Sequence, residues 1–134
     1  MRIMIDTNVL LSSLVFQSKK LTTLIEKVAE EHTMVLCSFV IDELYSVIRR
    51  KAPEYEEVID KFLSKLSFEY VFSAKPIEKE KLFEIRDEND YIILHTAIIE
   101  GIDILITGDK DFRDINIEKP KILTPAEFIE RYIK

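Results

Sequence analysis

The amino-acid sequence predicts a three-layer α/β domain, in which helices cover both faces of a parallel sheet of four to five strands. Short apolar segments such as "RIMID" and "DILIT" recur along the chain without polar alternation, which is typical of strands buried on both faces. Longer segments with a helical spacing of apolar residues lie between them. Strands that alternate with helices form a parallel sheet between two helical layers, so we expect the α/β/α class.

Three strands and three helices are expected in the first half of the chain. The expected strands are residues 2–6, 33–38 and 68–72. The expected helices are residues 21–32, 38–52 and 54–66. Ser38 is a suitable N-cap for the second of these helices, which ends before Pro53. Apolar residues at helical spacing give that helix one buried face: Val40, Ile41, Leu44, Val47 and Ile48.

Three helices and two strands are expected in the second half. One helix has Pro76 near its first turn, and Pro125 leads the last helix, because proline suits the start of a helix. The helix over residues 89–101 has the clearest ends, with Asn89 in the cap position and Gly101 just past the last turn. The expected strands are residues 103–107 and 121–124.

Length and composition indicate one domain over residues 1–134. Cys37 is the single cysteine and lies in an apolar stretch, so we expect a buried thiol and a reducing, cytoplasmic location. No apolar run approaches the ~20 residues of a membrane span, so no membrane association is expected. The net charge of −6 argues against broad electrostatic binding to nucleic acid. It remains compatible with a nuclease whose clustered carboxylates bind cations.

Two aspartates lie at the carboxyl ends of expected strands. Asp6 ends the first strand, and Asp109 follows the strand at residues 103–107. The carboxyl ends of parallel strands lie at one edge of a sheet, where α/β proteins bind their ligands. We therefore expect Asp6 and Asp109 to be neighbours.

Two further acids lie on helices that reach the same edge. Glu43 lies on the border of the apolar stripe of its helix, whereas Asp42 points nearly away from that stripe into solvent. Asp90 falls in the first turn of its helix, on the face directed towards the core. Asp87 and Asp111 are candidates for an outer position in the same cluster.

A cluster of these acids predicts a metal site. Carboxylates within a few ångströms of one another cannot all remain ionised unless a cation joins them. Oxygen ligands without neighbouring cysteine or histidine favour Mg²⁺ or Mn²⁺ over zinc. Such ions activate water and stabilise the leaving oxygen in an in-line attack on a phosphodiester. Asp6, Glu43, Asp90 and Asp109 are therefore the candidate metal ligands and catalytic residues.

Each acid has an ordinary explanation when it is considered alone. Asp109 could simply make a turn with Gly108, and Asp90 could simply favour a helix N-terminus. Glu43 could be a solvated residue at the border of its helix. Asp6 is harder to explain, because an acid at the end of a buried strand needs a partner. The joint occurrence of four such positions favours a site.

Four segments together resemble the PIN-domain family, in the family's order and over nearly the whole chain. They are "MIDTNVLLSSL", "IDELYSVIRR", "RDENDYIILHTAIIEGIDILITGDKDF" and "ILTPAEFI". The resemblance implies a PIN-like fold and a metal-dependent endoribonuclease that cleaves single-stranded RNA. It places Asp6, Glu43, Asp90 and Asp109 at the family's acidic positions.

The resemblance extends to three polar residues near these acids. Thr7 and Asn8 match the polar pair after the first aspartate, and Thr107 matches the hydroxyl residue before the last one. The long "RDEND…TGDKDF" form is most similar to the prokaryotic branch that includes toxins of toxin/antitoxin pairs. The resemblance therefore implies an antitoxin protein as partner and a homodimer.

Basic residues near the expected site are candidates for contacts with RNA. Lys110 and Arg113 border the acids and could contact the backbone of the substrate. Arg49, Arg50 and Lys51 form a short basic run at the end of a helix, where a solvated helix terminus is the more ordinary explanation.

Other functions remain open at this stage. A non-catalytic PIN-like module that binds RNA or protein would retain the fold, although four repelling acids weigh against it. A phosphoacceptor domain of receiver type also carries acids at strand ends, but Ser73 and Ala74 follow the strand at residues 68–72 where an acid would be needed. A P-loop enzyme is disfavoured because the sequence contains no G-x-x-x-x-G-K-[ST] motif.

Overall fold

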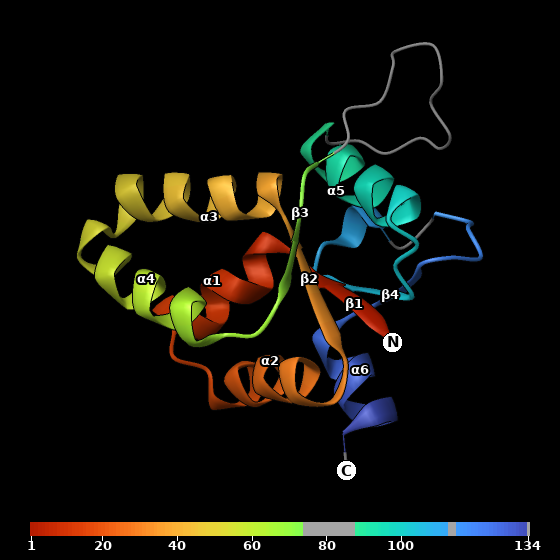
Figure 1. Ribbon diagram of the computed structural model, residues 1–134, viewed down its shortest axis with the longest axis horizontal. Helices are drawn as coiled ribbons and strands as arrows, with labels where there is room; N and C mark the ends of the chain where they lie inside the picture. The colour runs from red at the N-terminus through yellow and green to blue at the C-terminus, as the bar shows by residue number, and fades with distance from the viewer. Residues whose placement is uncertain (74–87, 113–114, 134) are drawn as a thin grey trace.

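Five parallel strands form one sheet in the computed structural model, which describes residues 1–73, 88–112 and 115–133 (Figure 1). The strands are β1 (Arg2–Ile5), β2 (Thr33–Cys37), β3 (Glu69–Val71), β4 (Ile104–Ile106) and β5 (Lys121–Leu123). The α-helices in the described part are α1 (Thr7–Val15), α2 (Lys19–Glu31), α3 (Ser38–Lys51), α4 (Glu56–Lys65), α5 (Glu88–Ile99) and α6 (Pro125–Tyr132). Two short 3₁₀ helices are η1 (Pro53–Tyr55) and η2 (Lys110–Phe112). Helices flank both faces of the sheet, which confirms the predicted three-layer α/β/α class.

The expected strands are all present, and each end differs from its expected position by no more than one residue. Five of the expected helices are present as well. The helix expected at residues 54–66 is observed as the 3₁₀ turn η1 followed by α4. The helix expected from Pro76 lies outside the described residues. In the ranges that the structure describes, no helix is long and apolar enough to cross a membrane.

Helix α1, directly after β1, is not predicted by the sequence. Its segment "TNVLLSSLV" contains no charged residue, so it lacks the polar face that marks an amphipathic helix. Neighbouring elements cover α1 almost all round, because only Asn8 is exposed; its buried residues are Thr7, Val9, Leu10, Ser13 and Leu14. The start of α1 could have been recognised, since Asp6 occupies its N-cap and accepts a hydrogen bond from the backbone of Asn8.

The strand order β3-β2-β1-β4-β5 places β1 and β4 side by side in the middle of the sheet. From β1 the chain builds outwards through β2 and β3, whereas β4 and β5 build the opposite half. The order therefore reverses between β1 and β4, where Ile5 pairs with Ile106. The pairing continues past β1, because the backbone N–H of Asp6 donates to the carbonyl of Ile106 at 3.1 Å. Ligands of open α/β sheets bind at such a reversal, beyond the carboxyl ends of the strands.

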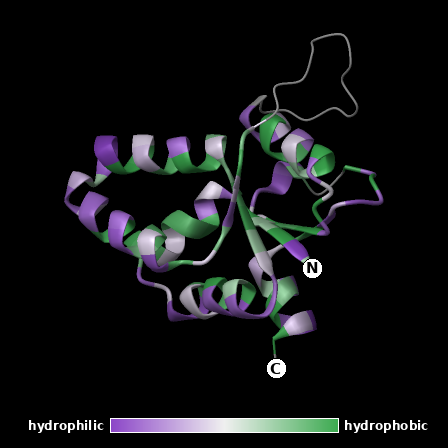
Figure 2. Cartoon of the chain, viewed as in Figure 1, coloured by the Kyte–Doolittle hydropathy of each residue, from purple (hydrophilic) through white to green (hydrophobic). Residues whose placement is uncertain are grey.

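The middle strands carry the hydrophobic core. Ile3, Met4 and Ile5 in β1 are fully buried, and so is Leu105 in β4. Figure 2 shows hydrophobic residues along the strands and hydrophilic residues on the outer sides of the helices. Burying one such side chain stabilises the fold by roughly 1.5–3 kcal/mol. The residues that follow β1 and β4 are thus attached to the most firmly packed part of the molecule.

The start of α3 differs from the prediction. Its N-cap residue is Cys37, whose side chain makes no capping hydrogen bond, so the assignment of Ser38 as the cap is wrong. Ser73, just after β3, takes over this role: its hydroxyl accepts a hydrogen bond from the backbone N–H of Phe39 at 2.8 Å. In return, the backbone N–H of Ser73 donates to the hydroxyl of Ser38 at 2.9 Å. A cap supplied from a distant segment leaves no local sequence signal.

The two ends of α5 compare differently with the prediction. The helix begins at Glu88, so Asn89 lies inside its first turn and is not the cap. The end is as predicted, because Gly101 has a positive φ of 65°. The backbone N–H of Ile102 donates to the carbonyl of Ala97 at 3.0 Å, as in a Schellman motif. This end fixes the direction in which the chain enters β4.

Candidate metal centre

Asp6 is the acid at the reversal of the strand order. It directly follows β1, caps α1, and is 3% exposed. One carboxylate oxygen, Oδ1, accepts a hydrogen bond from the backbone N–H of Asn8 at 2.7 Å. The other, Oδ2, accepts a short hydrogen bond from the hydroxyl of Thr107. The carboxylate is therefore buried and held in one orientation by groups from both sides of the reversal.

The environment of Asp6 disfavours its charge. Burial raises the pKa of Asp6 above its ordinary value of 3.8, and this is the largest effect. The hydrogen bonds from Thr107 and Asn8 lower the pKa. Glu43 and Asp109 lie near enough for their negative charges to raise it again. A cation at this place would offset both burial and repulsion.

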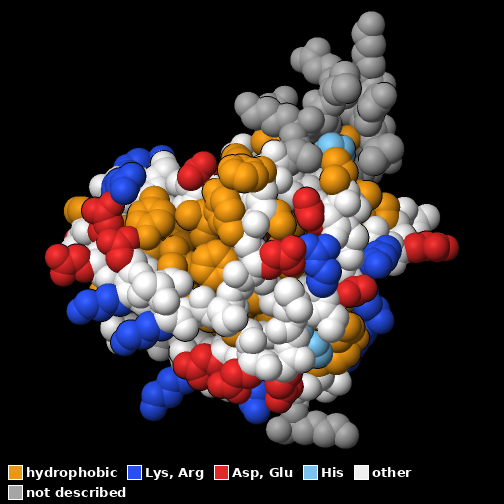
Figure 3. All heavy atoms as spheres, in the orientation of Figure 1, with side chains coloured by type: hydrophobic (Ala, Val, Ile, Leu, Met, Phe, Trp, Pro, Cys, Tyr) orange, Lys and Arg blue, Asp and Glu red, His pale blue; other side chains and the backbone are white. Residues whose placement is uncertain are grey.

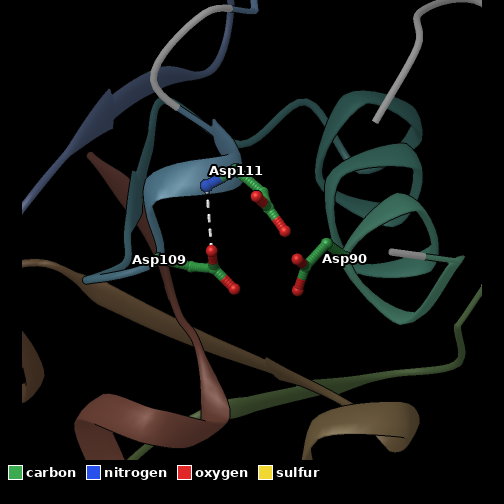
Figure 4. Close-up of side chains that lie close together, drawn as sticks. All are labelled: Asp90, Asp109 and Asp111. Atoms are coloured by element: carbon green, nitrogen blue, oxygen red, sulfur yellow. Dashed lines mark hydrogen bonds between the residues drawn. The ribbon is translucent and has the colours of Figure 1, made fainter. Parts of the chain in front are cut away.

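The segment after β4 forms a tight turn that presents two further carboxylates. The hydroxyl of Thr107 accepts a hydrogen bond from the backbone N–H of Asp109 at 3.1 Å. The carboxylate of Asp109 in turn accepts one from the backbone N–H of Asp111 at 2.9 Å, drawn as a dashed line in Figure 4. Thr107 thus connects Asp6 to the turn that carries Asp109 and Asp111.

Asp90 completes a group of three carboxylates. It lies in the first turn of α5 and is 7% exposed, while Asp109 and Asp111 are half-buried. One carboxylate oxygen from each of the three lies within 4.8 Å of those of the other two. Figure 4 shows the side chains of Asp109 and Asp111, from the turn after β4, facing Asp90 across the space next to α5. We call Asp90, Asp109 and Asp111 the aspartate trio.

Glu43 lies on α3, the helix that follows β2. Its side chain is half-buried, and its charge acts on Asp6. Asp42, its neighbour in sequence, is exposed. The structure therefore places Glu43 on the side of Asp6 and leaves Asp42 in solvent, as the helical spacing indicates.

The remaining candidate residues have varied positions. Thr7 is buried, and its hydroxyl has no hydrogen-bond partner in the described part of the chain. Asn8 and Lys110 are exposed. Asp87 and Arg113 lie outside the described residues.

The aspartate trio suits a hard divalent cation. All its donors are carboxylate oxygens, and no cysteine or histidine from the described segments belongs to the group. Oxygen ligands lie about 2.1 Å from Mg²⁺, so ligands on opposite sides of one ion are separated by ~4.2 Å. Neighbouring ligands of one octahedral ion are ~3.0 Å apart, so oxygens that lie within 4.8 Å of one another can share an ion once their side chains turn towards it. The donor chemistry and the spacing therefore both fit Mg²⁺ or Mn²⁺.

The structure changes how the candidate acids are grouped. It brings Asp90 and Asp109 together and adds Asp111, for which the sequence indicates only an outer position. Asp6 lies near Asp109, and Glu43 lies near Asp6, but neither belongs to the trio. The two acids of "DKD" after a strand are a visible signal, but their convergence depends on the turn through Thr107 and Asp109, which the sequence does not specify.

Comparisons with known proteins support the fold. A sequence model described as "PIN domain" matches residues 2–111. The chain is 27% identical to a chain in the crystal structure of VapBC2 from Rickettsia felis bound to a DNA fragment from the promoter, with a TM-score of 0.69 and coverage of 92% of this chain and 98% of that one. A chain of the DNA-bound VapBC from Salmonella typhimurium has the same fold at 17% identity, with a TM-score of 0.66 and coverage of 93% and 98%. No curated protein matches the sequence.

Proposed function

The chain belongs to the PIN-domain family, and on this basis we propose that it is a metal-dependent endoribonuclease that cleaves single-stranded RNA. The observation that carries the proposal is the meeting of the aspartate trio beside the buried Asp6, at the reversal of the strand order. A folded protein gains no stability from gathering like charges in this way. The repulsion among these carboxylates is explained if a cation binds between them and holds a phosphodiester at the site.

In the proposed mechanism the acids have two roles. Asp90, Asp109 and Asp111 would hold the divalent cation through their carboxylate oxygens. A bound Mg²⁺ or Mn²⁺ supplies a more acidic water molecule and stabilises negative charge on phosphate oxygens. Asp6 keeps a fixed orientation beside the trio because Thr107 donates to it, so it can direct a water molecule towards the phosphorus atom.

Other residues around the acids complete the proposed site. Glu43 would share with Asp6 the task of orienting water or a second cation. Lys110 is exposed and lies between Asp109 and Asp111 in sequence, and it would contact a backbone phosphate of the RNA. Arg113 would make a similar contact. Asp87 would take an outer position near Asp90.

We propose further that the protein is the toxin of a toxin/antitoxin pair. The likeness to a VapBC2 structure at 27% identity over 92% of this chain supports this. The surface supports a protein partner, because Tyr70 and Phe72 are 48% and 79% exposed. Figure 3 shows hydrophobic side chains gathered over α3 and α4 and beside β3 on the face in view. Exposed apolar areas of this kind mark interaction surfaces. The proposal includes an antitoxin partner, a homodimer and a cytoplasmic location.

The test of the nuclease activity is the cleavage of a mixed pool of single-stranded RNA by the purified protein, with Mn²⁺ or with EDTA. We expect cleavage only with the metal, and a loss of about 100-fold or more in Asp6→Asn. The matched control is Asp42→Asn, which makes the same chemical change on an exposed aspartate and should retain full activity. Full activity of Asp6→Asn would refute the assignment of this site. Absence of cleavage under all conditions would favour the non-catalytic RNA- or protein-binding module.

A further inference from the structure

An open cavity of about 730 Å³ adjoins the metal centre. It shares Thr107 and Asp109 with that centre and extends along β5 to the start of α6. Among the described residues, the rest of its wall includes the apolar side chains of Ile115, Ile117 and Ile122 and the charged side chains of Glu118, Lys121 and Glu127. Its volume lies in the range of roughly 300–1,000 Å³ that is usual for small-molecule sites.

We propose that this cavity is a base pocket, which takes one unpaired nucleobase of the RNA next to the phosphodiester at the metal centre. This inference rests on the proposed nuclease function. The half-buried side chains of Ile115, Ile117 and Ile122 give the cavity apolar surface on which a flat base can pack. Because Asp109 belongs to both the cavity and the trio, a nucleotide with its phosphate at the trio has its base within reach of this surface.

The charges around the cavity favour a base over a phosphate group. Among the described residues of its lining, three carry carboxylates, Asp109, Glu118 and Glu127, and one, Lys121, is cationic. A phosphate would be repelled from the interior of such a cavity. A neutral base would not be repelled, and its amino groups can donate hydrogen bonds to carboxylates. The lining therefore assigns the phosphate to the metal centre and the base to the cavity.

The backbone of β5 can read the edge of such a base. The N–H of Lys121 and the carbonyl of Leu123 bond towards β4, to Asp103 and Thr107 respectively. Alternate residues of a parallel strand direct their backbone groups to opposite sides, so the N–H and C=O of Ile122 point away from β4. Each RNA base carries an adjacent donor and acceptor on its Watson–Crick edge, which can pair with these two groups. Only an unpaired base exposes that edge, so the pocket would select single-stranded RNA.

The first test does not require any catalytic activity. Backbone amide signals of the protein are recorded by NMR during titration with each of the four nucleoside 5′-monophosphates at millimolar concentration. At least one of them should shift the amide signals of Ile117 and Ile122 in a saturable way. The variant Ile117→Trp fills the cavity and should remove the shift at Ile122. The matched control is Ile99→Trp, on a side chain that is 57% exposed and lies outside the cavity, and it should bind like the wild type.

If none of the four nucleotides shifts these amides, or if Ile117→Trp binds as well as the wild type does, the base pocket is refuted. The titration of the unmodified protein decides this even where the tryptophan variant fails to fold. Binding of nucleotides in the cavity without any RNA cleavage would retain the pocket and refute the nuclease instead.

The second test uses cleavage itself. Sequencing of the cut ends from a random single-stranded RNA pool should show a base preference at one position adjacent to the cut. Ile117→Trp should lose this preference and about 10-fold or more of kcat/KM, whereas Ile99→Trp should keep both. Cleavage with no preference at any adjacent position would refute the base pocket and leave the nuclease assignment intact.

Discussion

Replacement of Asp6 by asparagine should stabilise the metal-free protein while it removes the activity. Asp6 is buried, its pKa is raised chiefly by burial, and the charges of Glu43 and Asp109 raise the pKa further. An asparagine of nearly the same size carries no charge, and it is as good an N-cap for α1 as aspartate. A residue that lowers stability and supports activity is the pattern expected of a functional acid.

The size of the expected gain in the free energy of unfolding follows from the contacts of Asp6. Burial of a carboxylate costs several kcal/mol in real proteins. Asparagine keeps only one acceptor oxygen, so one of the two hydrogen bonds, from Asn8 or from Thr107, is lost and the other goes to a neutral acceptor, at about 1 kcal/mol each. The net gain in the free energy of unfolding is therefore about 1–3 kcal/mol. At about 4 °C per kcal/mol for a chain of this size, the melting temperature should rise by roughly 4–12 °C.

The assay is thermal unfolding in EDTA, followed by circular dichroism over a series of pH values. Because the pKa of Asp6 in the folded protein lies above 3.8, the cost of its charge is absent below that value and fully present once the pH exceeds the folded pKa. The stability gained by Asp6→Asn should thus be largest at neutral pH and should shrink as the pH falls towards 3.8. Asp42→Asn serves as the exposed control and should change stability by less than about 0.5 kcal/mol.

Two results would refute this reasoning. One is a melting temperature of Asp6→Asn below that of the wild type at neutral pH in EDTA. The other is a gain in stability that is the same at all pH values, because it could not come from the charge of Asp6. Either result would mean that the carboxylate is well accommodated in the metal-free fold.

Three further predictions concern the parts of the fold that support the site. Ser73→Ala removes the distant cap of α3 and should lower the free energy of unfolding by about 1 kcal/mol in urea titrations. Gly101→Ala should cost about 1 kcal/mol, because φ is positive there and no neighbour lies within 4 Å of an added Cβ; Gly108→Ala, with equal space and no positive φ, should cost less in the same titration. Burial and a hydrogen bond to Asp60 raise the pKa of Tyr45 to about 12, so the phenol should ionise above the ordinary 10.0 in an ultraviolet pH titration, and Asp60→Asn should bring the pKa closer to 10.0. An equal loss in both glycine variants, or a normal Tyr45 titration, would contradict these accounts.

The sequence predicts the sheet well because the signal of each strand is local. An apolar run such as that around Ile3 and Met4 must be buried on both faces, and its neighbours in sequence already show this. Helix α1 is missed for the opposite reason. It packs against α2 and α3 and exposes only Asn8, so its residues do not show the contrast between polar and apolar faces.

The site is predictable only in part, for a related physical reason. Asp6 and Asp109 follow strands that turn out to be adjacent, and the sheet edge brings them near each other. The inclusion of Asp111 in the trio depends on the hydrogen bonds of the turn after β4, and a spacing of two residues in sequence does not determine these. The separation of Glu43 from the trio depends in the same way on how α3 packs beside α5.

The measurement that tests the central claim most directly is the binding of Mn²⁺ to the purified protein, followed by electron paramagnetic resonance. The wild type should bind Mn²⁺ in a saturable way, and Asp109→Asn should bind it at least ~10-fold more weakly, because the trio loses a ligand. Asp42→Asn should bind Mn²⁺ as the wild type does. Equal affinity in all three proteins would contradict the claim that the aspartate trio forms the metal centre.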